Sequence, residues 1–255
     1  GLWFGWAGVL RIATPLEAHI HANNWGFMAF VFAGLLVDLY PAFAGRALRW
    51  PRSLTPIFWM MLVGASCLVL APWLGGNLAP VFSVPGILLH LSATAWLLLN
   101  IILPARGTAL ARQPGFWHMV TAYVWIIVPV LGAPLIILKV PGFPGAGIEQ
   151  SAPQALVYGW VLQFGYGLIP YLFRRLFLPD APATLGGNWY SLALAHLGSL
   201  FLWASIFIGT YQPLLHGTAY ALWALSLIPI VIEVWRIITR ATDNQVSAES
   251  LLTAE

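Results

Sequence analysis

Charged side chains are scarce in this chain. Asp, Glu, Lys and Arg make up only 7% of its 255 residues, whereas 60% are hydrophobic, and the mean hydropathy is +0.83. A soluble domain carries about a quarter charged residues, so this chain has too few of them to cover a surface in water. The composition therefore excludes a soluble protein and predicts an integral membrane protein that contacts the lipid bilayer.

Cysteine and the common catalytic motifs are also rare or missing. The single cysteine, Cys67, lies in an apolar stretch, which excludes a disulfide framework and any cysteine-ligated cluster. The chain contains no Walker loop, no HExxH helix and no CxxCH haem-attachment site. Its basic residues form no stripe that suits a phosphate backbone, so nucleic acid is not an expected partner.

Long apolar stretches dominate what is present. They are continuously apolar, whereas the strands of a membrane barrel alternate over about ten residues. We therefore predict an all-α polytopic transmembrane bundle with about seven spanning helices, at residues 16–40, 55–74, 84–103, 115–137, 153–173, 188–211 and 216–235. Residues 1–12 are shorter than the ~20 residues that a span requires, so they form either a short interfacial segment or the end of a preceding helix. The expected organisation is one transmembrane domain over 1–240 and a short polar cytoplasmic tail over 241–255.

Arginines follow every second predicted span. They occur after the first, third, fifth and seventh spans, and the intervening loops hold at most Lys139. Cytoplasmic loops of membrane proteins are enriched in Lys and Arg. The first span is therefore expected to start outside and the C-terminus to lie in the cytoplasm, in a bacterial inner (cytoplasmic) membrane.

Histidines within the spans are the leading candidates for a functional site. A bilayer penalises ionisable side chains, and imidazole is a common ligand of metals and haem. At a rise of about 1.5 Å per residue, His21 and His90 both lie about 8–9 Å below the outer boundary. His216 lies at the outer start of the last span, and His19 precedes His21 by two positions. Two pairs can therefore hold a haem between facing helices: His21 with His90, or His19 with His216.

The other two histidines lie nearer the cytoplasmic side. His196 is about 12 Å deep on that side, and we expect it to be either a cofactor ligand or a hydrogen-bonding residue between helices. His118 lies at the inner start of its span and is expected to face the lipid headgroups, which is also the alternative interpretation of His216.

Some polar residues near these positions have predicted supporting roles. Positions i and i+2 of a helix point about 200° apart, so His19 and His21 do not readily serve one centre. Glu17 and Asn23 are close enough in sequence to orient the imidazoles through hydrogen bonds. At the cytoplasmic end of the last span, Glu233 is close enough to Arg236 to pair with it.

The stretch AHIHANNWGFMAFVFAGLLVDLYP resembles the second helix of the haem-copper oxidase subunit I superfamily. It is more similar still to the small oxidase-like proteins and the NnrS-type membrane proteins of nitric-oxide response. The matching residues are His19, His21, Asn23, Gly26, Gly34, Tyr40 and Pro41, followed by Phe43, Gly45 and Arg46. The resemblance covers about 30 residues and implies that one of His19 and His21 is an axial haem ligand near the outer face. A full oxidase subunit also needs an adjacent His-His pair for copper, which this chain lacks.

These observations favour a haem-binding membrane protein that holds b-type haem. It would act in electron transfer or in binding or responding to NO or O2, together with other respiratory membrane subunits or a cytochrome. If it is an enzyme, it is a respiratory oxidoreductase. One alternative is a copper- or metal-handling transporter whose outer histidines His19, His21 and His90 receive the metal. Another is a non-catalytic anchor subunit of a respiratory complex.

Overall fold

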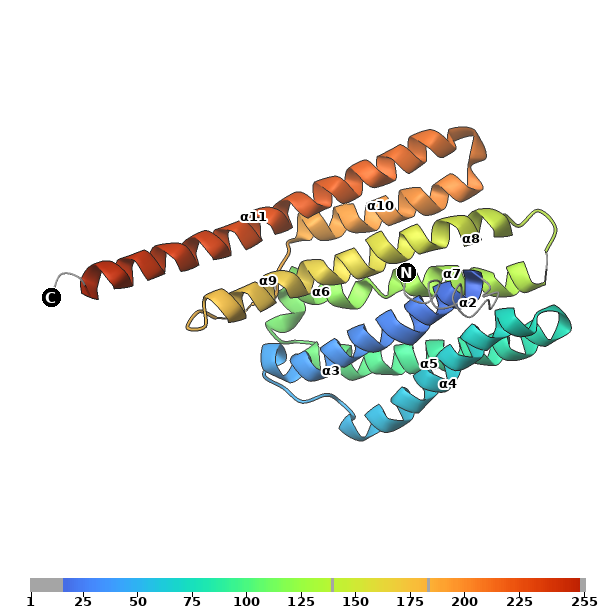
Figure 1. Cartoon of the computed structure of the whole chain (residues 1–255), viewed down its shortest axis with the longest axis horizontal. Helices are drawn as coiled ribbons and strands as arrows, with labels where there is room; N and C mark the ends of the chain where they lie inside the picture. The colour runs from blue at the N-terminus through green and yellow to red at the C-terminus, as the bar shows by residue number, and fades with distance from the viewer. Residues whose placement is uncertain (1–15, 139, 183, 253–255) are drawn as a thin grey trace, which may run out of the picture. The chain divides into compact units, whose positions relative to one another are not determined.

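The chain folds almost entirely into helices (Figure 1). The structure, a computed structural model, describes residues 16–138, 140–182 and 184–252, with side chains up to Asn244, and these residues contain no β-strand. The principal helices are α2 (Leu16–His21), η1 (Ala22–Met28), α3 (Ala29–Ala44), α4 (Leu54–Leu74), α5 (Ala79–Ala105), α6 (Pro114–Thr121), α7 (Val124–Ile137), α8 (Gly145–Gln154), η5 (Ala155–Leu162), α9 (Gln163–Phe177), α10 (Trp189–Phe207) and α11 (Gln212–Leu252). Of these, η1 and η5 are π-helical. Short 3-10 turns at Pro51–Ser53, Gly76–Leu78, Leu110–Arg112 and Gly209–Tyr211 precede α4, α5, α6 and α11.

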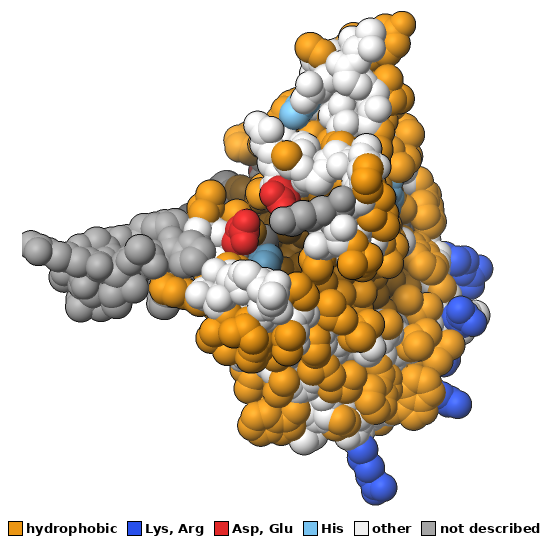
Figure 2. Space-filling view, turned by 90° about the vertical axis from the view of Figure 1, so that its right-hand side faces the viewer, with side chains coloured by type: hydrophobic (Ala, Val, Ile, Leu, Met, Phe, Trp, Pro, Cys, Tyr) orange, Lys and Arg blue, Asp and Glu red, His pale blue; other side chains and the backbone are white. Residues whose placement is uncertain are grey.

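Seven helical stretches within the described residues are long and apolar enough to cross a membrane. They are Leu16–Ala44, Pro51–Leu74, Gly76–Ala105, Pro114–Ile137, Gly145–Phe177, Trp189–Phe207 and Gly209–Asn244. Hydrophobic side chains cover much of the face drawn in Figure 2, and many large ones are exposed, such as Trp59, Leu88 and Val231. The predicted all-α class with seven spans is confirmed, and the protein is a multi-pass membrane protein.

Several spans extend beyond their predicted ends. Pro85 lies inside α5 and Pro153 inside α8, at or next to the predicted first residues 84 and 153 of these spans. Spanning helices tolerate proline because neighbouring groups satisfy the freed carbonyls. Helix α11 continues to Leu252, through most of the segment that the sequence assigns to a polar tail. The predicted apolar segment at residues 1–12 lies outside the described residues.

The chain divides into two compact units. Unit 1 contains Gly1–Arg106 and Ala133–Lys139, and unit 2 contains Gly107–Gly132 and Val140–Glu255. The sequence predicts a single transmembrane domain over 1–240 that includes both.

Unit 1 is built on a hairpin of α4 and α5, against which α2 and η1 pack. A Cβ added at Gly64 would lie 2.9 Å from the carbonyl oxygen of Gly86 and 2.9 Å from the backbone nitrogen of His90. Small residues let membrane helices approach this closely, so Gly64 sets the spacing of the hairpin.

A buried amide connects this hairpin to the preceding loop. The side chain of Asn100, on α5, accepts a hydrogen bond from the backbone N–H of Trp50. Its amide nitrogen donates to the carbonyl oxygen of Trp50 at 3.3 Å and to the hydroxyl of Ser53 at 2.6 Å. Asn100 therefore fixes the entry of the chain into α4.

Unit 2 is built on a second hairpin, formed by α10 and α11. Helix α9 packs against α11 and α6 packs against α9. A Cβ at Gly198 would lie 2.8 Å from Nε1 of Trp223 and 3.0 Å from the carbonyl oxygen of Ala219. Helix α10 starts at a capping box, in which the Ser191 N–H donates to Oδ1 of Asn188 at 2.8 Å and the Asn188 N–H donates to the Ser191 hydroxyl at 3.1 Å.

The two hairpins share a pattern of buried positions. When Gly64 is matched with Gly198, the buried residues Ile57, Met61, Ala65, Leu68 and Ala71 coincide with the buried residues Ser191, Ala195, Ser199, Leu202 and Ser205. When Pro80 is matched with Pro213, the buried residues Gly86, His90, Ala93 and Leu97 coincide with the buried residues Ala219, Trp223, Ser226 and Ile230. Each second helix follows a three-residue 3-10 turn.

The long helix before each hairpin follows the same pattern. Each contains a π-helical stretch, η1 in unit 1 and η5 in unit 2. When Tyr40 is matched with Tyr171, the buried residues Trp25, Ala29, Phe32, Ala33 and Leu36 coincide with the buried residues Leu156, Trp160, Gln163, Phe164 and Gly167. Each unit therefore contains a three-helix motif with buried residues at matching positions.

Candidate functional site

His21 lies at the end of α2 with its ring held against α4. Its Nδ1 is 2.7 Å from the carbonyl oxygen of Leu68, and because a carbonyl can only accept, Nδ1 carries the proton. Nε2 makes no hydrogen bond to any described residue, so it keeps its lone pair. Histidines that ligate metals are typically held through the other ring nitrogen in this way. The π-helical η1 begins at the next residue, and π-helical turns frequently mark functional sites.

His19 has a different environment, two residues earlier. Its Nε2 accepts a hydrogen bond from the side-chain amide of Asn23 at 3.0 Å, and the same amide nitrogen lies 3.1 Å from the His19 carbonyl oxygen. Asn23 therefore orients the imidazole of His19. Glu17 is exposed and makes no hydrogen bond to a described residue.

His90 is buried on α5, and both of its ring nitrogens face protein groups. Nε2 is 3.4 Å from the carbonyl oxygen of Trp25, and Nδ1 is 3.4 Å from the Thr94 hydroxyl. The ring also packs edge-on against the Trp25 indole, with centroids 4.9 Å apart. Because the Trp25 carbonyl can only accept, Nε2 is the protonated nitrogen of the neutral ring.

The structure places His21 and His90 in the same unit but against different turns of α4. His21 bonds to Leu68, whereas the backbone of His90 packs against Gly64. Leu68 and Gly64 are four residues apart, or about 6 Å along the axis. Both histidines therefore lie where α4 meets its neighbours in unit 1.

No three His, Cys, Asp or Glu side chains gather into a metal-binding group anywhere in the described residues. A metal ion held by protein side chains usually has three or four such ligands. Haem iron, in contrast, takes one or two axial ligands from the protein. In the described part of unit 1, the histidines His19, His21 and His90 therefore do not form a metal-binding group made of protein side chains alone.

His196 is the centre of a polar network in unit 2. The indole N–H of Trp125 donates to its Nδ1 at 3.0 Å, so Nε2 carries the proton of the neutral ring. Nε2 lies 2.8 Å from the Thr121 hydroxyl and 3.0 Å from the side-chain nitrogen of Gln163. Of the two interpretations of His196, this geometry shows the hydrogen bond between helices.

His118 is fully buried in unit 2, so the prediction that it faces the headgroups is wrong. Its Nε2 lies 2.8 Å from the hydroxyl of Ser191, which itself donates to the carbonyl oxygen of Asn188 at 2.8 Å. The hydroxyl proton is therefore engaged, and Nε2–H is the donor to Ser191. Packing of α6 against its neighbours, rather than the position of His118 along the span, decides its burial.

His216 also lies in unit 2. Its Nε2 is 3.0 Å from Oε1 of Gln154, and its ring stacks on Tyr220 with centroids 5.4 Å apart. His19 belongs to unit 1, so the two members of the predicted pair, His19 and His216, lie in different units.

The predicted pairing of Glu233 with Arg236 is wrong, because Glu233 pairs with Arg174 of α9. Its second carboxylate oxygen accepts the backbone N–H of Gly187 at 2.9 Å. Arg174 is far from Glu233 in the sequence, so spacing along one helix does not reveal this partner. Asn100 was not predicted as a structural residue, although an amide inside an apolar span is a signal for one.

Comparison of the chain with protein-family models, curated proteins and solved structures found no match in any of the three.

Proposed function

We propose that this protein binds b-type haem in the membrane, with Nε2 of His21 as an axial ligand. The observation that carries the proposal is the state of the His21 ring, whose Nδ1–H is held by the Leu68 carbonyl while Nε2 keeps its lone pair. The resemblance of residues around His19 and His21 to the oxidase-like and NnrS-type proteins supports the same ligand.

The other histidines of unit 1 suggest which kind of haem site this is. Asn23 engages Nε2 of His19, and Trp25 and Thr94 engage the ring of His90. Unit 1 therefore offers one imidazole with an open nitrogen. Haem held by one histidine would supply an iron with a position for a diatomic gas. The proposed function is accordingly the binding of NO or O2, in preference to electron transfer through a bis-histidine haem.

Charge placement supports an orientation for this site. Arginines lie at or directly after the ends of the first, third, fifth and seventh spans, which favours a cytoplasmic location for those ends. His21 would then lie near the outer face of a bacterial inner membrane, where a respiratory partner or a dissolved gas has access to it.

The test is haem content and optical spectrum of the full chain, expressed with ample haem and purified in detergent. We expect a Soret band from the unaltered protein and a further shift of that band when carbon monoxide is added to the reduced form. His21→Ala should lose the band, because the iron loses its ligand. Added imidazole should restore it in that variant, which a folding defect would not allow.

His19→Ala is the matched control, because it removes a neighbouring imidazole whose Nε2 is already engaged by Asn23. It should retain the haem of the unaltered protein. Equal haem content in His21→Ala and His19→Ala would refute the ligand assignment. A reduced spectrum that carbon monoxide does not change would contradict the one-histidine site.

A further inference from the structure

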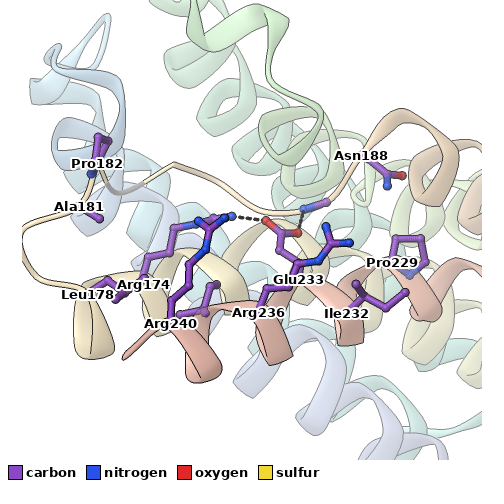
Figure 3. A pocket seen from close by; sticks show the side chains of 12 residues that line it. Arg174, Leu178, Ala181, Pro182, Asn188, Pro229, Ile232, Glu233, Arg236 and Arg240 are labelled. Carbon is purple, nitrogen blue, oxygen red and sulfur yellow. Dashed lines mark hydrogen bonds and ion pairs between the residues drawn. The ribbon is translucent and has the colours of Figure 1, made fainter. Parts of the chain in front are cut away.

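A cavity of about 720 Å³ lies in unit 2, between the C-terminal part of α9, the connector that follows it and α11 (Figure 3). Its charged lining residues are Arg174, Glu233, Arg236 and Arg240. Apolar side chains, including Leu178 and Ile237, complete the wall. The cavity therefore combines positive charge with an apolar surface.

The single carboxylate of the cavity is already neutralised. One oxygen of Glu233 accepts from Arg174, and the other accepts the backbone N–H of Gly187, as the dashed lines in Figure 3 show. Arg174 also donates to the carbonyl oxygen of Thr184 at 2.7 Å. Glu233 and Arg174 therefore hold the connector in place and offset each other's charge.

Arg236 and Arg240 remain as unpaired cations. Neither makes an ion pair or a side-chain hydrogen bond with a described residue. They are four positions apart on α11, so their side chains leave the same face with Cβ atoms about 6 Å apart. Each guanidinium carries five N–H donors in a planar fork, and both are exposed.

The matching part of unit 1 shows that the shared fold does not require this charge. In the register that matches Pro80 with Pro213, Asn100 coincides with Glu233 and Leu103 coincides with Arg236. Asn100 fixes its connector with a neutral amide, through Trp50 and Ser53. The motif therefore folds without a cation at the position of Arg236.

We infer that this cavity binds a phosphate group, held by the guanidinium forks of Arg236 and Arg240. Arginine forks match the oxygens of phosphate in bidentate geometry, and two of them on one helix face can reach one tetrahedral anion. Basic pockets between spanning helices on the cytoplasmic side bind the headgroups of anionic lipids. The phosphate can belong to such a headgroup or to a soluble phosphate, and the inference does not depend on haem binding.

The experiment is native mass spectrometry of the full chain in detergent, titrated with phosphatidylglycerol or with inorganic phosphate. We expect Arg236→Gln/Arg240→Gln to raise the apparent Kd at least ~10-fold, since the two forks supply the charge-assisted contacts. Both side chains are exposed, so the variant should elute as the unaltered protein does. The single variants Arg236→Gln and Arg240→Gln should each show a smaller rise.

Arg175→Gln is the matched control. Arg175 is exposed at the same end of α9 but does not line the cavity, so its loss should leave binding unchanged. Lipid binding that inorganic phosphate does not displace assigns the headgroup as the source of the phosphate. Binding of inorganic phosphate with the same dependence on Arg236 and Arg240 assigns a soluble source. Equal affinity of the double variant and the unaltered protein for both probes would overturn the inference.

Discussion

The two units of this protein share a three-helix motif but differ in their polar side chains. In each, a helix with a π-helical stretch precedes a tight hairpin whose small residues meet at matching positions, Gly64 with Gly86 and Gly198 with Ala219. Many buried positions coincide, but most of the polar residues do not. With Tyr40 matched to Tyr171, His21 of unit 1 coincides with Ala152 of unit 2.

The two units differ in their polar side chains. In unit 1, Nε2 of His21 makes no hydrogen bond to a described residue. The loop before the hairpin is held by the neutral amide of Asn100. In unit 2, His196 is enclosed in a hydrogen-bond network. The connector before the hairpin is held by the ion pair of Arg174 with Glu233, which lies beside a basic cavity. Apolar burial defines the scaffold in both units, which leaves the polar positions free to differ in function.

The largest expected effect on stability concerns the side chains that hold the connectors before the two hairpins, Asn100 in unit 1 and Glu233 in unit 2. Asn100→Ala should lower the free energy of unfolding by about 3 kcal/mol, because it removes a fully buried amide that makes three hydrogen bonds and leaves the Trp50 N–H without its acceptor. Glu233→Ala should cost about 1–2 kcal/mol, because its ion pair is partly exposed and water can solvate Arg174. Thermal unfolding in detergent measures both, and a greater loss in Glu233→Ala would break the comparison.

The second prediction compares the two hairpins. Gly64→Ala should cost about 2 kcal/mol, since the new Cβ meets backbone atoms of Gly86 and His90 that cannot move independently. Gly198→Ala should cost less, because one of its close contacts is the side chain of Trp223. Gly34→Ala is the control: nothing lies within 4 Å of its added Cβ, so it should be neutral or stabilising. Equal losses at Gly64 and Gly34 would show that the hairpin does not depend on close approach.

The third prediction separates a structural histidine from a ligand. His196→Leu should lower stability by about 1–2 kcal/mol, since Trp125 and Thr121 lose their partner. The haem content of the purified variant should match that of the unaltered protein, in contrast to His21→Ala. Loss of haem in His196→Leu at unchanged thermal stability would move the proposed site to unit 2.

The smallest expected effect concerns the tautomer of His196. Trp125→Phe removes the donor to Nδ1 while keeping an aromatic ring, at a cost of about 1 kcal/mol. Chemical shifts of the His196 ring nitrogens, recorded by NMR on labelled protein, should show a protonated Nε2 before the substitution and a mixture of tautomers after it. A protonated Nδ1 in the unaltered protein would contradict the assigned network.

Much of the fold was predictable from the amino-acid sequence. The scarcity of charge, the length of the apolar stretches and their continuity predict an all-α membrane bundle with seven spans, because the bilayer admits helices whose backbone groups bond internally. The helix ends were less predictable, since Pro85 and Pro153 lie inside helices and look like boundaries in the sequence. The likeness of the two units could not be predicted from the sequence, because they share burial at matching positions but few identical residues.

The sequence also identifies the histidines as candidates for a functional site, since an ionisable side chain in a lipid environment is energetically costly. Which ring nitrogen of each is engaged depends on partners far away in the chain. His21 bonds to Leu68, His196 bonds to Trp125 and Thr121, and Glu233 pairs with Arg174. Composition and hydropathy are local properties of a segment, and they decide whether it enters the bilayer. Hydrogen bonds are short-range and directional, so their partners follow from how the helices pack.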